Sequence, residues 1–380
     1  MLLRLPDILL VLLAFQLLFA SLFLFAKKTA KPLSNRLLAC FFLVLFLAIA
    51  DSILRRTVIR DEYPGLVNFS GAFPLLYGPL LYLYTRSLFY NSFQLTRKDF
   101  IHFVPFAILF ISSEVSYQVQ PLGKKIEILT SISLHQLPAQ FYIIALLLTV
   151  HFGIYSIASL RIIKRYKLLA LNKFSLYQKV NIDWLSSTII FFLCLFALSV
   201  ANNFFEVTHL VGYHLVALSA IILLLFYFVN RLLFKALNNP EIFNRVDEMA
   251  STVNKKVPPV TDDKKSAELI AIEAYMKDKR PYLNPELTVD LLAGEIKMYP
   301  KDLSRLINDQ LGQNFFDFVN RYRISEAQQM LTNHPDKKIT VLEILYQTGF
   351  NSKSSFNTLF KKYTGLTPSE YKNEASQANS

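Results

Sequence analysis

The sequence predicts an all-α protein in two parts. The first part is an N-terminal bundle of about seven transmembrane helices, because apolar runs of about 20 residues, enough to cross roughly 30 Å of hydrocarbon, recur up to about residue 235. The second is a C-terminal domain with two helix-turn-helix units joined by a long helix, because short amphipathic helical patterns broken by Pro and Gly replace the apolar runs.

The apolar runs differ in how many polar residues interrupt them. The first and seventh are nearly free of polar atoms, whereas the fourth is interrupted by Pro105 and contains the charged Glu114 near its C-terminal end. A cleaved signal peptide is an alternative for residues 1–26, but the run is long, has no clear small-residue cleavage site, and precedes six more runs. The predicted spans cover residues 5–26, 33–54, 64–89, 100–117, 135–160, 183–205 and 212–234.

The formal net charge of +12 belongs to the apolar part. Positions 1–239 hold 21 Lys and Arg against 9 Asp and Glu, whereas positions 240–380 hold 19 of each. Thirteen of these basic residues lie in the loops after spans one, three and five, and six lie on the opposite side. The positive-inside rule therefore predicts an outer N-terminus and a cytoplasmic C-terminal domain, so the charge reports topology rather than a nucleic-acid footprint.

Changes in composition predict four segments. Residues 1–235 form the transmembrane domain, 236–265 a cytoplasmic linker with one helix around 240–253, 266–373 the second domain, and 374–380 a polar tail. If mostly flexible, a linker of about 30 residues has a root-mean-square reach of roughly 30 Å. The second domain could then lie just below the membrane and still meet a cytoplasmic partner.

In the second domain, helices are predicted over 288–296, 300–311, 315–331 and 352–363, with a short helix just before the last. Val289, Leu291, Leu292 and Ile296 are the predicted buried residues of the first of these. The 315–331 helix would act as a rigid spacer.

Helices 300–311 and 352–363 share one design. A helix and a tight turn precede each, and Gly312 or Gly365 follows as a stop. Opposite the apolar face, each carries only Arg, Lys, Ser, Thr or Asn, which can bond base edges and phosphates. An ordinary solvated face is the alternative for one such helix, but the repetition favours DNA binding. The predicted DNA-facing residues are Lys301, Ser304, Arg305, Asn308, Ser354, Ser355, Thr358 and Lys361.

Residues 266–373 resemble the C-terminal DNA-binding domain of AraC/XylS-type bacterial transcription regulators. The matching stretches include 303–307 with Gly312, 315–324 with Ala327, and 349–352 with 365–368 and Tyr371. The resemblance implies two units in successive major grooves, roughly 34 Å apart. It carries over reading roles to Lys301, Ser304, Arg305, Ser354, Ser355 and Thr358.

Two positions depart from that family pattern. Tyr299 stands where a small capping residue is usual, and Leu345 with Tyr346 stands where Ala is common. In the apolar part, residues 78–84 and 102–106 look like the seven-span region of membrane-bound AraC-type regulators. That resemblance implies a sensor in a bacterial cytoplasmic membrane and names no ligand.

Polar residues near the outer ends of spans five to seven are candidate sensor residues. Imidazole and carboxylate groups could bind a transition metal or titrate near neutral pH. Interfacial polar residues are the favoured alternative, because no tight ligand spacing is present, and we predict no metal site and no cofactor. Cys40 and Cys194 lie in apolar spans and suggest neither a disulfide nor zinc. The candidate residues are His135, Glu206, His209 and His214.

These patterns together predict a membrane-anchored one-component transcription factor regulated by a signal ligand, and not an enzyme, since no catalytic motif is present. Its predicted partners are double-stranded DNA and the lipid bilayer, with RNA polymerase and a second copy of the chain as further candidates. The alternative is a transporter or membrane enzyme that carries a regulatory DNA-binding domain. In span three only Pro74 and Pro79 are of the helix-breaking kind expected for transport, and there is no clear internal repeat.

Overall fold

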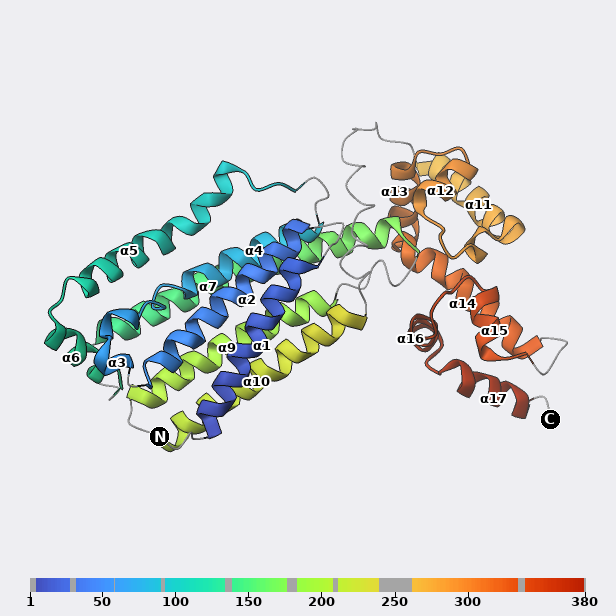
Figure 1. The fold of residues 1–380 in the computed structure, drawn as a ribbon. Coiled ribbons are helices and arrows are strands. Elements are labelled where there is room, and N and C mark those ends of the chain that lie inside the picture. Colours follow the sequence, from blue (N-terminus) through green and yellow to red (C-terminus); the bar gives the residue numbers. More distant parts are fainter. Residues whose placement is uncertain are drawn as a thin grey trace. The chain divides into compact units, whose positions relative to one another are not determined.

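The computed structural model describes residues 5–27, 32–57, 59–89, 93–133, 139–175, 183–207, 211–238, 262–333 and 339–378. Within these ranges the regular elements are helices (Figure 1), and extended backbone pairs at an isolated bridge between Phe174 and Thr288. The all-α prediction is therefore confirmed. The backbone divides into two compact units: unit 1 is Met1–Ile163 with Asp183–Ser251, and unit 2 is Lys164–Ile182 with Thr252–Ser380.

Unit 1 is built from long helices that run side by side (Figure 1). Helix α1 packs against α2 and α10, α2 packs against α4, and α9 packs against α10. The main helices are α1 (Leu5–Ala26), α2 (Pro32–Leu54), α4 (Pro74–Phe89), α5 (Val104–Gln118), α7 (Ala139–Lys173), α9 (Asp183–Val207) and α10 (Val211–Asn238). Shorter helical pieces are α3 (Ile59–Glu62), η1 (Pro64–Leu66), η2 (Arg97–Phe103) and α6 (Leu122–Ser133).

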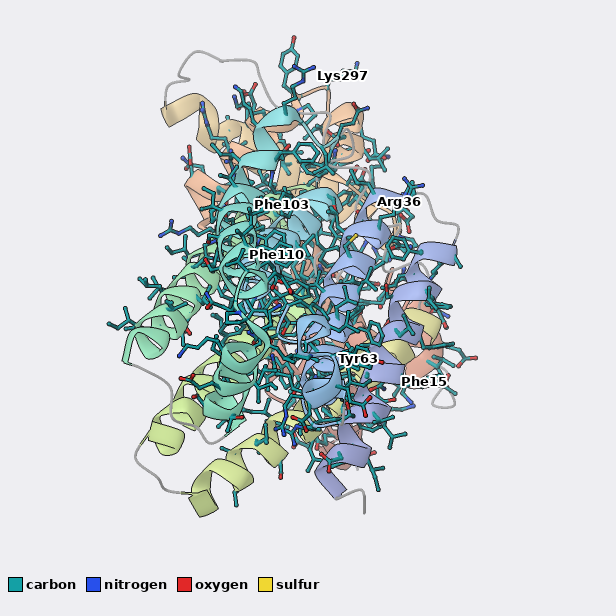
Figure 2. All side chains as sticks on the ribbon, turned by 60° about the vertical axis from the view of Figure 1, so that its left-hand side comes forward. Phe15, Arg36, Tyr63, Phe103, Phe110 and Lys297 are labelled. Atoms are coloured by element: carbon teal, nitrogen blue, oxygen red, sulfur yellow. The ribbon has the colours of Figure 1, made fainter. Side chains whose placement is uncertain are left out.

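In the part of the chain that the structure describes, four helical stretches are long and apolar enough to cross a membrane by length and composition. Several of their apolar side chains point outward, and Phe15 of α1 is 69% exposed (Figure 2). Such exposed apolar surface is of the kind that lipid covers. The four stretches are Asp7–Ala26, Pro32–Leu54, Arg97–Gln118 and Ile143–Lys173, and shorter apolar stretches are Asp183–Ser199 and Val216–Arg231.

The predicted third span, residues 64–89, is not one continuous helix. Its helix α4 begins only at Pro74, after the turn η1 and a non-helical stretch. That stretch folds around the buried carboxylate of Asp51, which accepts hydrogen bonds from the Asn68 backbone N–H and the Ser70 hydroxyl, both at 2.6 Å. Arg55 pairs with the same carboxylate at 2.6 Å. The pattern of apolar residues predicted the length of the run but not this break.

Unit 2 contains the end of α7 and a second set of helices. These are α11 (Asp262–Lys279), η5 (Pro281–Leu283), α12 (Val289–Glu295), α13 (Pro300–Leu311), α14 (Phe315–Asn333), α15 (Val341–Gln347), α16 (Lys353–Thr364) and α17 (Pro368–Ala378). Thus α17 continues into the predicted polar tail, and α11 begins before residue 266. The helix predicted around 240–253 lies outside the described residues.

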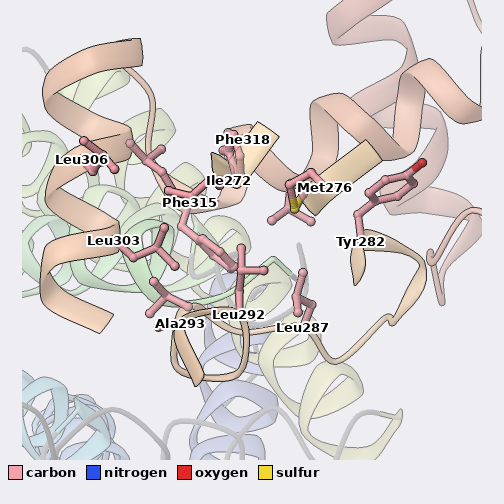
Figure 3. Close-up of a cluster of buried hydrophobic side chains, with 13 residues drawn as sticks. Ile272, Met276, Tyr282, Leu287, Leu292, Ala293, Leu303, Leu306, Phe315 and Phe318 are labelled. Atoms are coloured by element: carbon pink, nitrogen blue, oxygen red, sulfur yellow. The ribbon is translucent and has the colours of Figure 1, made fainter. Parts of the chain in front are cut away.

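The first half of unit 2 folds around one apolar core (Figure 3). The core is lined by α11, α12, α13 and the start of α14, with Leu292, Leu303 and Phe315 at its centre. Leu291, which the sequence placed in this core, is 48% exposed. At 100° per residue, the inward positions of α12 are Val289, Leu292 and Ala293, which leaves Leu291 on the outside.

Candidate nucleic-acid interface

The first helix pair consists of α12 and α13. Thr288 begins α12, because its hydroxyl accepts a hydrogen bond from the Leu291 backbone N–H at 3.2 Å. The chain then turns through Lys297 in the left-handed region, and Pro300 starts α13 with its preset φ. Tyr299, at the N-cap, makes no side-chain cap bond and is 76% exposed. The position therefore offers an aromatic ring beside α13 instead of a cap.

Helix α13 has a buried face and a polar face. Leu303, Leu306 and Ile307 are buried, whereas Lys301 and Arg305 are exposed. Ser304 and Asn308 are partly buried, and the Asn308 amide donates a hydrogen bond to the Ser304 carbonyl oxygen at 2.7 Å. At 100° per residue, these four polar positions fall within about 100° of the helix circumference, so they form one surface. We call them the α13 polar face.

The second helix pair, α15 and α16, is built in the same way. Thr340 and Glu343 form a capping box at the start of α15. The turn passes through Gly349 at φ 82°, and the Ser352 hydroxyl caps α16. Gly365 ends α16 at φ 83°, as Gly312 ends α13 at φ 62°. Local sequence signals therefore fix both ends of both polar helices.

The exposed side of α16 contains Ser354, Thr358 and Lys361, which we call the α16 polar face. Ser355, also predicted to face DNA, is only 4% exposed. It lies one helical turn before the buried Leu359 and next to the buried Phe356, so the helix carries it toward the core. In this structure Ser355 is not placed to meet a base edge.

Asp317 of α14 links the spacer helix to α16. Its carboxylate accepts hydrogen bonds from the Lys362 ammonium and the Tyr363 hydroxyl, both at 2.7 Å. Burial raises the pKa of Asp317, but these donors outweigh it and hold the pKa below its usual value. The same bonds, with burial as the largest cause, raise the pKa of Tyr363. Asp317 is thus ionised and connects α14 to α16.

Arg323 of α14 is a buried cation bonded to backbone carbonyl oxygens. Its Nε donates to Tyr282 and its Nη2 donates to Asn284, both at 2.7 Å. Burial lowers the pKa of Arg323 to about 10. It remains charged at neutral pH, and its planar fork of donors suits this arrangement of acceptors.

Residues 172–175, at the end of α7, bond to the C-terminal helices within unit 2. The Ser175 carbonyl oxygen accepts from Asn320 at 2.9 Å and from Arg323 at 3.2 Å, and the Ser175 hydroxyl donates to the Leu287 carbonyl oxygen at 2.6 Å. Phe174 and Ser175 are both buried. The sequence reading placed this segment in a basic loop and missed these contacts, and no local pattern marks them.

The described part of the structure does not show the predicted outer-face sensor residues lying together. His135 and His209 lie outside the described residues, and only the backbone is described for Glu206 in α9 and His214 in α10. Within the described residues, no group of three or more His, Cys, Asp or Glu side chains could hold a metal ion.

In unit 1, the two sequence stretches that suggested a sensor do meet. His102 of η2 lies in edge-to-face contact with Tyr82 of α4, and its Nδ1 is 2.8 Å from the Tyr155 hydroxyl of α7. Gly78 packs on Tyr155, since an added Cβ would lie 2.9 Å from the Tyr155 ring. These contacts join α4, η2 and α7.

Residues 292–374, which run from the middle of α12 through α13, α14, α15 and α16 into α17, match the family described as a helix-turn-helix domain. This part of the chain is a DNA-binding domain of the kind that transcriptional regulators carry.

Curated relatives agree with this class. The chain is 34% identical over 98 residues to the "Uncharacterized transcriptional regulatory protein YesN" of Bacillus subtilis, covering 25% of this chain and 26% of the relative. It is 32% identical over 90 residues to the "Transcriptional regulatory protein HptR" of Staphylococcus aureus, covering 24% and 34%. It is 29% identical over 92 residues to the "HTH-type transcriptional regulator MtrA" of Neisseria gonorrhoeae, covering 24% and 30%. The matches thus span about a third or less of these relatives.

Two solved structures are also similar. One is the C-terminal domain of AraT, a response regulator from Geobacillus stearothermophilus, with 24% identity, a TM-score of 0.25, and coverage of 28% of this chain and 84% of that one. The other is the C-terminal domain of the two-component response regulator yesN from Fusobacterium nucleatum, with 25% identity, a TM-score of 0.24, and coverage of 29% and 99%.

Proposed function

We propose that this chain is a membrane-anchored one-component transcription factor of the AraC type, whose two helix pairs act as helix-turn-helix units in successive major grooves. The observation that carries the proposal is the pairing of two alike polar faces. Helices α13 and α16 each follow a capped helix and a tight turn, each end at a left-handed Gly, and each expose only polar side chains opposite the core. The α14 helix joins them as the spacer.

Within these units, the proposed base-reading and phosphate-contacting residues are those of the polar faces. In α13 they are Lys301, Ser304, Arg305 and Asn308, and in α16 they are Ser354, Thr358 and Lys361. Arg and Lys are suited to guanine and phosphate, and Ser, Thr and Asn to base edges or phosphates. We leave out Ser355 because it is buried.

For the N-terminal part, we propose seven membrane spans with the N-terminus outside and the helix-turn-helix domain in the cytoplasm. The excess of Lys and Arg in the loops after spans one, three and five supports this orientation. An independent observation agrees. The chain just after the proposed span five bonds to the DNA-binding domain through Ser175, which supports placing both on the same side of the membrane.

The membrane part would sense a signal ligand and bias DNA binding, with no catalytic step. A second copy of the chain and RNA polymerase are further proposed partners. The outer-face residues His135, Glu206, His209 and His214 are candidates for sensing, and replacing all four with Ala tests them. Unchanged transcriptional output from the target genes would reject that assignment.

Genome-wide DNA occupancy of the full-length chain in its host tests the proposal. The matched variant carries Lys301→Ala, Arg305→Ala and Thr358→Ala and must still reach the membrane. We expect discrete peaks for the native chain that the variant loses. Peaks that persist in the variant would reject the reading residues. If no peak appears and sealed vesicles instead show solute flux, the chain is a transporter with a regulatory domain.

A further inference from the structure

The strongest unexplained feature is the contact between residues 172–175 and the first helix pair. Ser175 occupies a polar site formed by Leu287, Asn320 and Arg323, in which its carbonyl oxygen and hydroxyl make four hydrogen bonds between 2.6 and 3.2 Å. Phe174 is buried and pairs with Thr288, the residue that caps α12. Within unit 2, residues 172–175 therefore fit against the C-terminal helices as a bound peptide fits its site.

Two further contacts extend this docking onto the polar helices. Lys173 forms an ion pair with Asp290 of α12 at 3.5 Å. The Asn308 amide, besides its bond to Ser304, lies 3.3 Å from the Asn172 side-chain oxygen. Asn308 belongs to the α13 polar face, about 20° around the helix from Lys301 and about 60° from Arg305. The end of α7 thus contacts the surface proposed to read DNA.

The major groove of DNA cannot hold both α13 and the last turn of α7. The major groove of B-DNA is about 12 Å wide and admits one α-helix, whose diameter with side chains is about 10–12 Å. With Asn172 against Asn308, the last turn of α7 takes up space that the groove wall would need. DNA binding by α13 and docking of residues 172–175 are then mutually exclusive.

The DNA-binding domain keeps its own core when the segment leaves. Arg323 would lose the two bonds to Ser175 at 3.2 Å but keep the two shorter ones to Tyr282 and Asn284 at 2.7 Å. Water can reach the donors that are freed once Ser175 no longer covers them. The contact can therefore open without leaving a buried cation unpaired.

We propose that residues 172–175 are an autoinhibitory element that docks on the first helix pair and blocks its entry into DNA. This inference rests on the proposed DNA-binding function and adds how that function is held off. The inhibitory signal would pass through α7, because the segment is the continuation of that helix.

Disulfide trapping in the full-length chain tests the docking without DNA. The chain has two cysteines, so Cys40→Ala with Cys194→Ala gives a clean background. Phe174→Cys with Thr288→Cys then places thiols at a bridge pair, where Cα atoms lie about 4.5–5.5 Å apart, within disulfide range. A protease site inserted between residues 250 and 251 reports the bond. We expect the oxidised fragments to stay joined on a non-reducing gel.

The matched control is Leu168→Cys with Thr288→Cys, which shares the loss of the Thr288 cap but uses an exposed position on α7. It should leave the fragments separate. Separate fragments in the Phe174 variant, or joining as efficient in the control, would overturn the docking.

The inhibitory role is tested by DNA affinity in lipid nanodiscs, with duplexes selected from a random library by the reduced full-length chain. We expect oxidation of the Phe174→Cys/Thr288→Cys variant to weaken binding by roughly 10-fold or more, and reductant to restore it. Lys173→Glu should strengthen binding by roughly 5- to 30-fold, and adding Asp290→Lys should return it toward the native value.

Joined fragments with unchanged affinity, or weaker binding by Lys173→Glu, would overturn autoinhibition while leaving the DNA-binding function standing. In a different outcome, the fragments stay joined as expected while no variant selects a duplex in either redox state. That result would reject the DNA-binding function. The two failures are therefore distinguishable.

Discussion

Arg323 of α14 donates a hydrogen bond from Nε to the carbonyl oxygen of Tyr282, 2.7 Å away, and so fastens the spacer helix to the turn η5. The guanidinium is almost completely buried, and among the described residues it donates to three backbone carbonyl oxygens, the Ser175 hydroxyl and the Asn320 side chain. A charge held this way depends on the fit of its donors to fixed acceptors.

Replacing Arg323 with Leu should destabilise the DNA-binding domain by roughly 2–5 kcal/mol, because the carbonyl oxygens of Tyr282 and Asn284 would lose their donors in a buried site. Hydrogen exchange of α14 and α16 amides in the full-length chain measures this loss. Arg321→Leu, two positions earlier and exposed, is the control. Full protection in Arg323→Lys would contradict the argument, since a point charge cannot reproduce the fork.

Gly349→Ala should disrupt the turn between α15 and α16. The residue has φ 82°, and an added Cβ would lie 2.6 Å from the Tyr282 carbonyl oxygen. We expect a loss of about 2 kcal/mol or more, from the left-handed strain of about 1–2 kcal/mol with the clash added. Hydrogen exchange in α15 and α16 reports it.

Gly312→Ala is the matched control for that substitution, because Gly312 also has positive φ, 62°, but open space around its Cβ position. Its cost should be the conformational strain alone. Equal effects of the two substitutions would show that the contact with Tyr282 adds nothing.

Asp317 should make the joint between α14 and α16 sensitive to acid. Its pKa in the folded chain lies below the ordinary value of 3.8, so the unfolded chain binds the proton more readily. The stabilisation is then present at neutral pH and is lost as the pH falls from about 4 through the folded pKa. Hydrogen exchange measures the protection of the amides near α16 at pH 7 and at pH 3.5. The difference in protection between the two pH values should be smaller in Asp317→Asn than in the native chain.

The exposed Asp309 supplies the control for the acid effect, because Asp309→Asn removes a carboxylate outside this cluster. It should keep the native difference between the two pH values. The same loss of pH dependence in both variants would remove Asp317 from this role.

Removing a basic side chain from the α13 polar face should weaken DNA binding. We expect Lys301→Ala or Arg305→Ala to cost about 1–3 kcal/mol for each base contact that is lost, measured as affinity for a selected duplex at fixed salt. Lys279→Ala removes the same charge from the exposed surface of α11 and is the control. Equal weakening by the control would indicate a general charge effect instead of groove contacts.

The helices of the DNA-binding domain could be predicted from sequence because their signals are local. Pro300 and Gly312 bound α13 as expected, and α16 begins and ends within one residue of the prediction. The burial of individual residues was predicted less well than the ends of the helices. Leu291 was placed in the core because it is apolar, although the helical period puts it opposite Val289, Leu292 and Ala293. Ser355 lies at the edge of the polar face, and packing against neighbouring helices buries it.

Other features depended on residues far apart in sequence. The break before α4 arises because Asp51 gathers Asn68 and Ser70, which a count of apolar residues does not detect. The docking of Ser175 joins positions more than 100 residues apart. Periodicity and caps describe one helix at a time and carry no information on such contacts.

Helix α7 has 35 residues and is therefore about 52 Å long, roughly 20 Å more than the hydrocarbon layer of a bilayer. A rod of that length converts a tilt into a displacement. A change of about 10° around its Ala139 end would move its Lys173 end by about 9 Å, more than the 5.4 Å rise of one helical turn. In the membrane-anchored arrangement proposed above, a small tilt of α7 would be enough to pull Ser175 from its site, because the helix is long.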